Sequence, residues 1–330
     1  MDFNSHDRKL KRIVYILVGG ILIFYAGFRN GDYVFDYKMY QWLYDEEIYV
    51  VEPTFTAISL ITRYLLGGNI VWLFLIYAVI GVGIKFIAIK RLSPLIFLSV
   101  LIYVSDFFPL QEMAQMRAGV ATGIMLLAID PLYERKGKKF ALLTFIAFLF
   151  HISSIVMIPL WFLNPYKINK KFWVTIILVG YIIAFLKIDV ISLLSYVPLG
   201  VIREKYEIYR AQQEEGGYVA NIFSLLFLIK LLLTFLLLWK SEILVEKTKY
   251  GYLLLKIMFV ALASLLLLSQ NLAAGLRVSE FYGIVSIVLF PMLYYIIRPR
   301  WFAWIIIITA AIGFIMVRIF SMQLISSMPL

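Results

Sequence analysis

The chain has 330 residues, of which 63% are hydrophobic and only 15% are charged. A soluble protein of this composition would expose large apolar patches, so the composition excludes that class and predicts a membrane protein. The net charge of +11 does not indicate nucleic-acid binding here, because membrane proteins carry Lys and Arg on their cytoplasmic loops as a means of orientation.

Apolar runs recur along the whole chain and predict an all-α polytopic membrane protein with about nine to eleven transmembrane helices. The first run has a basic flank but no cleavage site, so we expect it to be retained as a helix. No repeat or linker divides the chain, and we expect one integral membrane domain over 1–330. The runs are 13–28, 69–90, 94–108, 117–133, 172–188, 218–239, 252–271, 279–297 and 301–320, with longer loops at 29–68 and 189–217.

The run 140–163 is ambiguous. As a continuous helix its 24 residues would measure about 36 Å and cross the bilayer once. A single crossing would place the lysines of the turn 164–171 outside and invert every later loop. A re-entrant segment, or an equivalent even number of crossings, keeps more Lys and Arg on the cytoplasmic side. We therefore predict a re-entrant segment, with the loops 29–68 and 189–217 outside.

Isolated charged residues then gather at the outer face. A lone arginine at a helix end is often an anchor that reaches the headgroups, and we interpret Arg63 and Arg318 in that way. Arg117 and Arg277 differ because small residues beside them predict close helix packing. Arginines on one cavity suit a phosphate-bearing ligand, while acidic partners could hold them or act as a base. The charged residues at this face are Arg29, Asp32, Asp36, Asp106, Glu112, Arg117, Arg203, Lys205, Arg210, Arg277 and Glu280.

His151 lies in the middle of an apolar run, beside Ser153 and Ser154. Two interpretations stay open: a hydrogen-bonded packing residue, or an imidazole that accepts a proton from an acceptor hydroxyl. The chain has no cysteine and two histidines. This excludes disulfides and Cys-ligated metals, and we expect no metal or other cofactor.

Four phrases resemble the EpsG-type branch of the Wzy-like polysaccharide polymerases, in that family's order. FRNGDYVFDYKMY holds Arg29, Asp36, Tyr37 and Tyr40, with Glu52 further along. The family commonly has Gly-Thr-Asp-Tyr here, whereas this chain offers both Asp32 and Asp36, of which we favour Asp36. The other three phrases are MRAGVATGI with Arg117, AFLFHISSIVMIP with His151, and Arg277 followed by Phe281, Tyr282 and Pro291.

The resemblance implies a GT-C-like glycosyltransferase of the bacterial inner membrane with its site on the periplasmic side. It would join undecaprenyl-pyrophosphate-linked oligosaccharide repeats, beside a flippase and a chain-length regulator. The resemblance implies pyrophosphate binding by Arg29, Arg117, Arg203, Arg210 and Arg277. It implies activation of the acceptor hydroxyl by His151, Asp36 or Glu280. It implies sugar contacts by Tyr37, Tyr40 and Tyr282.

Three other functions compete with this one. A transporter or flippase for a lipid-linked or anionic substrate would also place arginines in a membrane cavity, although no inverted repeat is visible. An acyltransferase would use a membrane histidine with a strong acid near it in sequence. An O-antigen ligase shares most of the polymerase chemistry, and the residues separate the two poorly.

Overall fold

The computed structural model describes residues 5–31, 34, 36–48, 52–190, 192, 211 and 219–321. These residues form helices joined by turns and contain no strand, so the chain is an all-α polytopic membrane protein, as predicted. Within this part, four helices are long and apolar enough to cross a bilayer, or five if the bent pair Leu272–Gly283 and Ser286–Ile296 is one span. The four are Asp7–Gly27, Ile70–Leu92, Ile96–Ala114 and Arg300–Phe320.

The chain divides into two compact units. Unit 1 comprises Met1–Ile158 and Ile305–Leu330, and unit 2 comprises Pro159–Trp304. The expected single membrane domain stays a prediction, and each unit is described separately below.

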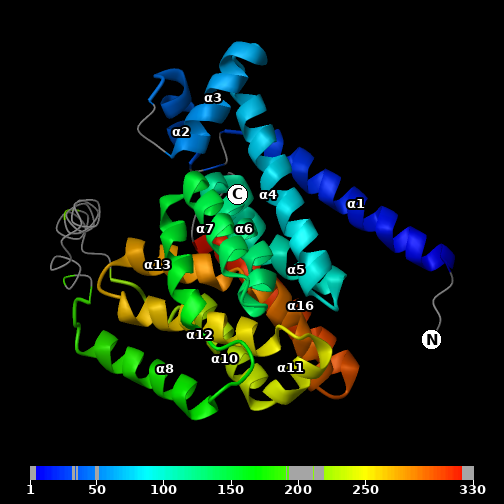
Figure 1. Ribbon diagram of the computed structural model, residues 1–330, viewed down its shortest axis with the longest axis vertical. Helices are drawn as coiled ribbons and strands as arrows, with labels where there is room; N and C mark the ends of the chain where they lie inside the picture. The colour runs from blue at the N-terminus through cyan, green and yellow to red at the C-terminus, as the bar shows by residue number, and fades with distance from the viewer. Residues whose placement is uncertain are drawn as a thin grey trace. The chain divides into compact units, whose positions relative to one another are not determined.

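Unit 1 is a layer of packed helices (Figure 1). In this layer α1 packs on α4, α4 on α6, and α6 on α7, while α3 contacts both α4 and α7. Gly123 lets α6 approach α4 closely, because a Cβ there would lie 3.0 Å from Ile84. The helices are α1 (Ser5–Gly27), α2 (Tyr37–Asp45), α3 (Pro53–Leu65), α4 (Ile70–Leu92), α5 (Ile96–Ile102), the π-helix η1 (Tyr103–Ala114), α6 (Met116–Tyr133) and α7 (Gly137–Phe150).

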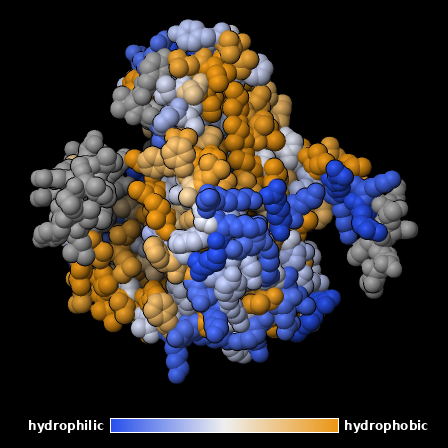
Figure 2. Space-filling view, in the orientation of Figure 1, coloured by the Kyte–Doolittle hydropathy of each residue, from blue (hydrophilic) through white to orange (hydrophobic). Residues whose placement is uncertain are grey.

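The basic residues of α1 are confined to its N-terminal end. Figure 2 shows hydrophilic side chains there and apolar ones along the middle of the helix. The apolar side chains of α1 are largely exposed, among them Ile16, Leu17, Ile21 and Phe24. An exposed apolar helix with a charged end is suited to lipid contact, with the charges at the headgroup level.

The charges of segment 103–114 are buried and paired, which corrects the expectation that Asp106 and Glu112 are isolated charged residues at the outer face. Asp106 and Arg318 are both fully buried, and Arg318 Nε donates to Asp106 Oδ1 over 2.9 Å. Glu112 forms an ion pair with Lys85 of α4, and Lys85 Nζ also donates to the carbonyl of Gly119 over 2.6 Å. A buried charge is costly without a partner, so Arg318 is a packing residue and not a headgroup anchor.

The ambiguous segment 140–163 is not one continuous helix. α7 ends at Phe150, His151 has extended backbone angles (φ −156°, ψ 121°), and a 3₁₀-helix, η2 (Ile152–Phe162), follows. A break at this point excludes a single straight 24-residue helix. The return of the chain to its starting side stays a prediction.

We expect Lys171→Cys to react with a membrane-impermeant maleimide from the cytoplasmic side only. Lys171 is exposed, and the chain has no other cysteine that could react. Intact and permeabilised cells would be labelled in parallel, with Glu46→Cys, an exposed residue of the loop 29–68, as the outside control. Labelling of Lys171→Cys in intact cells would contradict the re-entrant topology.

Unit 2 is organised around α12, which contacts α8, α10, α11 and α13. Nearly every side chain of α12 is buried, which fits its central place. The helices are α8 (Lys170–Phe185), α10 (Leu225–Trp239), α11 (Ser241–Lys247), α12 (Gly251–Leu267), α13 (Leu272–Gly283), α14 (Ser286–Leu289), the 3₁₀-helix η4 (Phe290–Met292) and α15 (Leu293–Ile296), and α16 (Arg300–Met316) begins here.

Candidate active site

The start of α3 is fixed against the end of α7 in unit 1. Pro53 occupies the first helical position, which suits its fixed φ and missing N–H. The hydroxyl of Thr54 donates to the carbonyl of Leu149 over 2.8 Å. This contact brings Glu52, the residue before the helix, beside His151, the residue after α7.

Glu52 joins two of the predicted site residues through one carboxylate. Its Oε2 forms an ion pair with Nη1 of Arg117, and its Oε1 lies 2.9 Å from Nδ1 of His151. The backbone N–H of Ile152 approaches Oε1 at 3.5 Å. The side chains of Glu52, Arg117 and His151 are 12%, 15% and 20% exposed to solvent. The group is therefore largely buried but accessible to a ligand.

The electrostatics of this group keep Glu52 ionised. Burial would raise the pKa of Glu52, but the hydrogen bond with His151 and the charge of Arg117 outweigh burial and lower the pKa to about 2. So acidic a carboxyl group is a poor base at neutral pH. An ionised carboxylate only accepts hydrogen bonds, so neutral His151 is assigned the tautomer with its proton on Nδ1 and a lone pair on Nε2.

Arg117 is held from its other side by aromatic rings. Its guanidinium carbon lies 5.4 Å from the ring centre of Tyr40 and 5.6 Å from that of Phe55. Tyr40 is buried, and burial raises its pKa, so it remains a neutral phenol. Tyr40 therefore supports Arg117 in this arrangement, and its predicted sugar contact stays a prediction.

Arg29 lies at the end of α1 with its guanidinium buried. Nε donates to the carbonyl of Ala26 over 2.8 Å, and Nη1 donates to the carbonyl of Met113. The guanidinium carbon lies 4.4 Å from the ring centre of Phe74, whose ring is 6.3 Å from that of Tyr40. Burial lowers the pKa of Arg29 to about 10, which leaves it cationic at neutral pH. Arg29, Tyr40, Glu52, Arg117 and His151 thus form one connected group, here called the Glu52 cluster.

Two guanidinium nitrogens of the Glu52 cluster find no acceptor among the described residues. They are Nη2 of Arg29 and Nε of Arg117, and both are buried. A buried donor without a partner is uncommon and costs free energy. An anion that accepted a hydrogen bond from either nitrogen would relieve that cost.

The remaining predicted residues of unit 1 lie around α2. Asp36 is half-buried at the N-terminal end of α2 and does not cap that helix, although its charge acts on Tyr40. Tyr37 packs on Phe74 with ring centres 4.8 Å apart. Asp32 lies outside the described residues, so the choice between the two aspartates stays a prediction.

Three predicted residues lie on or near α13 in unit 2. Arg277 is exposed, Glu280 is half-buried, and Tyr282 is buried at the wall of a cavity. Their participation in one site with the Glu52 cluster stays a prediction. Arg203 and Arg210 lie outside the described residues.

Sequence reasoning gave no catalytic role to Glu52, the residue at the centre of the cluster. The available signal was the pair Glu52–Pro53 ahead of an apolar helical run, which marks a helix start. In the described part of the chain, no group of three or more His, Asp and Glu residues could hold a metal ion.

A family model described as the EpsG family matches residues 12–329, nearly the whole chain. No curated protein and no solved structure gives a significant match. The match covers every residue of the Glu52 cluster.

Proposed function

Because this chain belongs to the EpsG family, the Wzy-like polymerase type, we propose that it polymerises lipid-linked oligosaccharide repeats of a surface polysaccharide. The growing glycan leaves undecaprenyl pyrophosphate and is joined to the non-reducing-end sugar of a new lipid-linked repeat. The reaction takes place at the periplasmic side of the bacterial inner membrane. A chain-length regulator and a flippase are the expected partners.

The observation that carries this proposal is the double contact of Glu52. One carboxylate holds a cationic guanidinium, Arg117, and an imidazole, His151, in one sheltered place. Glycosyl transfer from a pyrophosphate needs both kinds of group, since negative charge develops on the leaving group while the acceptor loses a proton.

In the proposed mechanism, His151 Nε2 accepts the proton of the acceptor hydroxyl, and Glu52 stabilises the imidazolium that forms. The acceptor oxygen bonds to the anomeric carbon of the growing chain as the bond from that carbon to the pyrophosphate oxygen breaks. The released pyrophosphate keeps the electron pair of that bond. Arg29 and Arg117 stabilise the charge through the two guanidinium nitrogens that lack acceptors in the described structure.

The other predicted residues extend this mechanism. We propose that Arg203, Arg210 and Arg277 add further pyrophosphate contacts. Asp36 and Glu280 are the alternative bases, and Tyr37, Tyr40 and Tyr282 contact the sugars. Each of these roles rests on the family resemblance.

The experiment that tests the function mixes the purified chain with the lipid-pyrophosphate-linked repeat of its own organism, without nucleotide sugars. The expected result is a ladder of increasing repeat numbers on a gel. If the protein is folded and the single repeats remain unchanged, the proposed polymerase function is wrong.

One observation favours a transporter or flippase as the second candidate. The ion pairs Lys85–Glu112 and Asp106–Arg318 are buried inside helices of the membrane part, and such residues also mark substrate pathways in transporters. Translocation of the single repeat across proteoliposomes, without ladder formation, would support that function.

A further inference from the structure

Lys85 and Glu112 form a buried ion pair in unit 1 that the proposed mechanism does not use. Their side chains are 0% and 1% exposed, and they come from α4 and the π-helix η1. A buried ion pair is a poor source of stability, because the cost of taking two charges out of water can exceed the gain from their attraction. Long π-helices are uncommon, and π-helical turns are frequent at functional sites. The place of this pair is therefore better explained by the geometry that it imposes.

On the η1 side, the pair is joined to Arg29. Met113, the residue after Glu112, accepts a hydrogen bond from Nη1 of Arg29 through its carbonyl. The charge of Glu112 also acts on the guanidinium of Arg29. A displacement of Glu112 would therefore move the carbonyl that holds Arg29 and weaken the field in which its guanidinium lies.

On the α6 side, the pair is joined to Arg117. Nζ of Lys85 donates to the carbonyl of Gly119 over 2.6 Å, and Gly119 lies two residues after Arg117. Because α6 begins at Met116, this bond is made in the first turn of the helix, the turn that bears the arginine. One ammonium group thus fixes both the segment that holds Arg29 and the helix end that carries Arg117.

Two glycines make room for the carboxylate of Glu112 between α4 and α6. A Cβ at Gly81 of α4 would collide with Oε2 of Glu112, and a Cβ at Gly119 would lie 3.2 Å from the same oxygen. Gly83, two residues further along α4, has open space at its Cβ position. The carboxylate is therefore confined from both sides, and confinement of this kind makes a rigid support for a binding site.

We propose that the Lys85–Glu112 pair is a positioning device for the pyrophosphate site, and that it sets the separation between the guanidinium groups of Arg29 and Arg117. The inference rests on the proposed function for the identity of the ligand. Two cations at a fixed separation bind the two phosphates of such a ligand better than two that move independently, because less freedom is lost on binding. Lys85 and Glu112 act through the arginines and do not contact the substrate.

The test measures the binding of inorganic pyrophosphate to the full detergent-solubilised chain by isothermal titration calorimetry. Lys85→Met together with Glu112→Met replaces both charges with apolar side chains of similar length, so the fold should be retained. We expect the affinity for pyrophosphate to fall on the order of tenfold, the size of one weakened hydrogen bond to an ion. The melting temperature of each variant shows whether it is folded.

Gly81→Ala and Gly83→Ala form a matched pair in the same helix. The methyl group added at Gly81 displaces the Glu112 carboxylate and leaves every charge in place, whereas the methyl group added at Gly83 meets open space. Gly81→Ala should lower the affinity for pyrophosphate by a few fold, and Gly83→Ala should leave it unchanged. Gly81→Ala is informative even if the double methionine variant does not fold.

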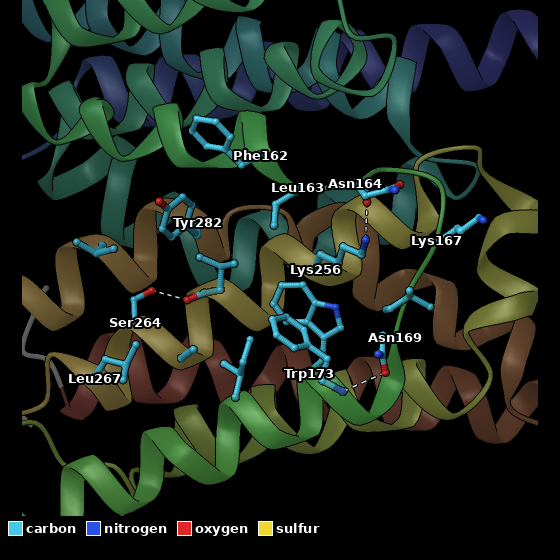
Figure 3. Close-up of a pocket in the computed structure, with 16 residues that line it drawn as sticks. Phe162, Leu163, Asn164, Lys167, Asn169, Trp173, Lys256, Ser264, Leu267 and Tyr282 are labelled. Atoms are coloured by element: carbon cyan, nitrogen blue, oxygen red, sulfur yellow. Dashed lines mark hydrogen bonds between the residues drawn. The ribbon is translucent and has the colours of Figure 1, made fainter.

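Arg117→Ala separates a failure of this inference from a failure of the site that it rests on. Pyrophosphate bound at other cations, such as Lys167 and Lys256 at the cavity of unit 2 (Figure 3), remains in Arg117→Ala and is subtracted. If Arg117→Ala lowers the affinity but Gly81→Ala and the double variant do not, the pair contributes to stability alone and the positioning role is wrong. If Arg117→Ala has no effect, the anion site is wrong and the positioning role falls with it. Ladder formation tests the polymerase separately, since pyrophosphate binding needs no lipid-linked repeat.

Discussion

Arg117→Ala is expected to slow ladder formation on the order of 10²-fold, the usual effect of removing one donor that stabilises developing charge. Arg117 is the cation that Glu52 holds in place, and its Nε has no acceptor in the described structure. The substitution removes the charge and the N–H groups that we assign to the leaving pyrophosphate. It also leaves Glu52 with His151 as its remaining side-chain partner. The measurement is the initial rate of ladder formation at saturating lipid-linked repeat.

The lysine variant and a matched arginine separate this role from a loss of folding. Arg117→Lys keeps the charge but loses the planar two-pronged donor geometry, so we expect a rate between wild type and Arg117→Ala. Arg63→Ala removes another arginine of unit 1, which pairs with Glu47 at 3.2 Å and is outside the cluster. Arg63→Ala should keep most of the wild-type rate. Full activity in Arg117→Ala would remove Arg117 from the mechanism.

The all-α membrane fold could be predicted from the sequence because it depends on local composition. Runs of apolar residues mark spans wherever they occur, whatever their partners. The same local logic identified Arg29, Arg117 and His151, since an isolated charge or imidazole beside an apolar run stands out. The structure brings Arg117 and His151 together, although 34 residues separate them in the sequence.

Pairings between distant residues could not be predicted in this way. Glu52 is 65 residues from Arg117 and 99 from His151, and Arg318 is 212 from Asp106. Hydropathy shows that a charged residue is unusual in a span but does not show which residue neutralises it. The sequence therefore places Asp106 and Glu112 among isolated charges at the outer face, whereas both are paired with residues on other helices.

The predicted site residues belong to both units, and their participation in one site stays a prediction. The four phrases that carry the family resemblance are ordered along the chain, and order alone suggests one site. Arg277, Glu280 and Tyr282 belong to unit 2, and the Glu52 cluster belongs to unit 1. Each phrase could be located from the sequence, but its place in space depends on helix packing that no single phrase encodes.

Glu52→Gln is expected to slow ladder formation on the order of 10²-fold or more, although the side chains assigned to the substrates are unchanged. The amide is nearly the same size as the carboxylate, but it no longer carries the charge that stabilises protonated His151 and pairs with Arg117. It can also donate to Nδ1, which would favour the other tautomer of His151 and remove the lone pair from Nε2. Loss of the acidic partner of a catalytic histidine is known to cost several orders of magnitude in rate, which sets the scale. Glu47→Gln, at the exposed ion pair with Arg63, is the matched control and should keep the wild-type rate.

The pH dependence of stability gives an independent measure of the same residue. The pKa of Glu52 is lowered from 4.5 to about 2, so its ionised form stabilises the fold above pH 4.5. That contribution is lost progressively as the pH falls from 4.5 toward 2. Melting temperatures of the detergent-solubilised chain between pH 7 and pH 3 should therefore fall more steeply for wild type than for Glu52→Gln, which lacks this titration. Coinciding curves, together with an unchanged rate of ladder formation, would show that Glu52 neither holds Arg117 nor orients His151.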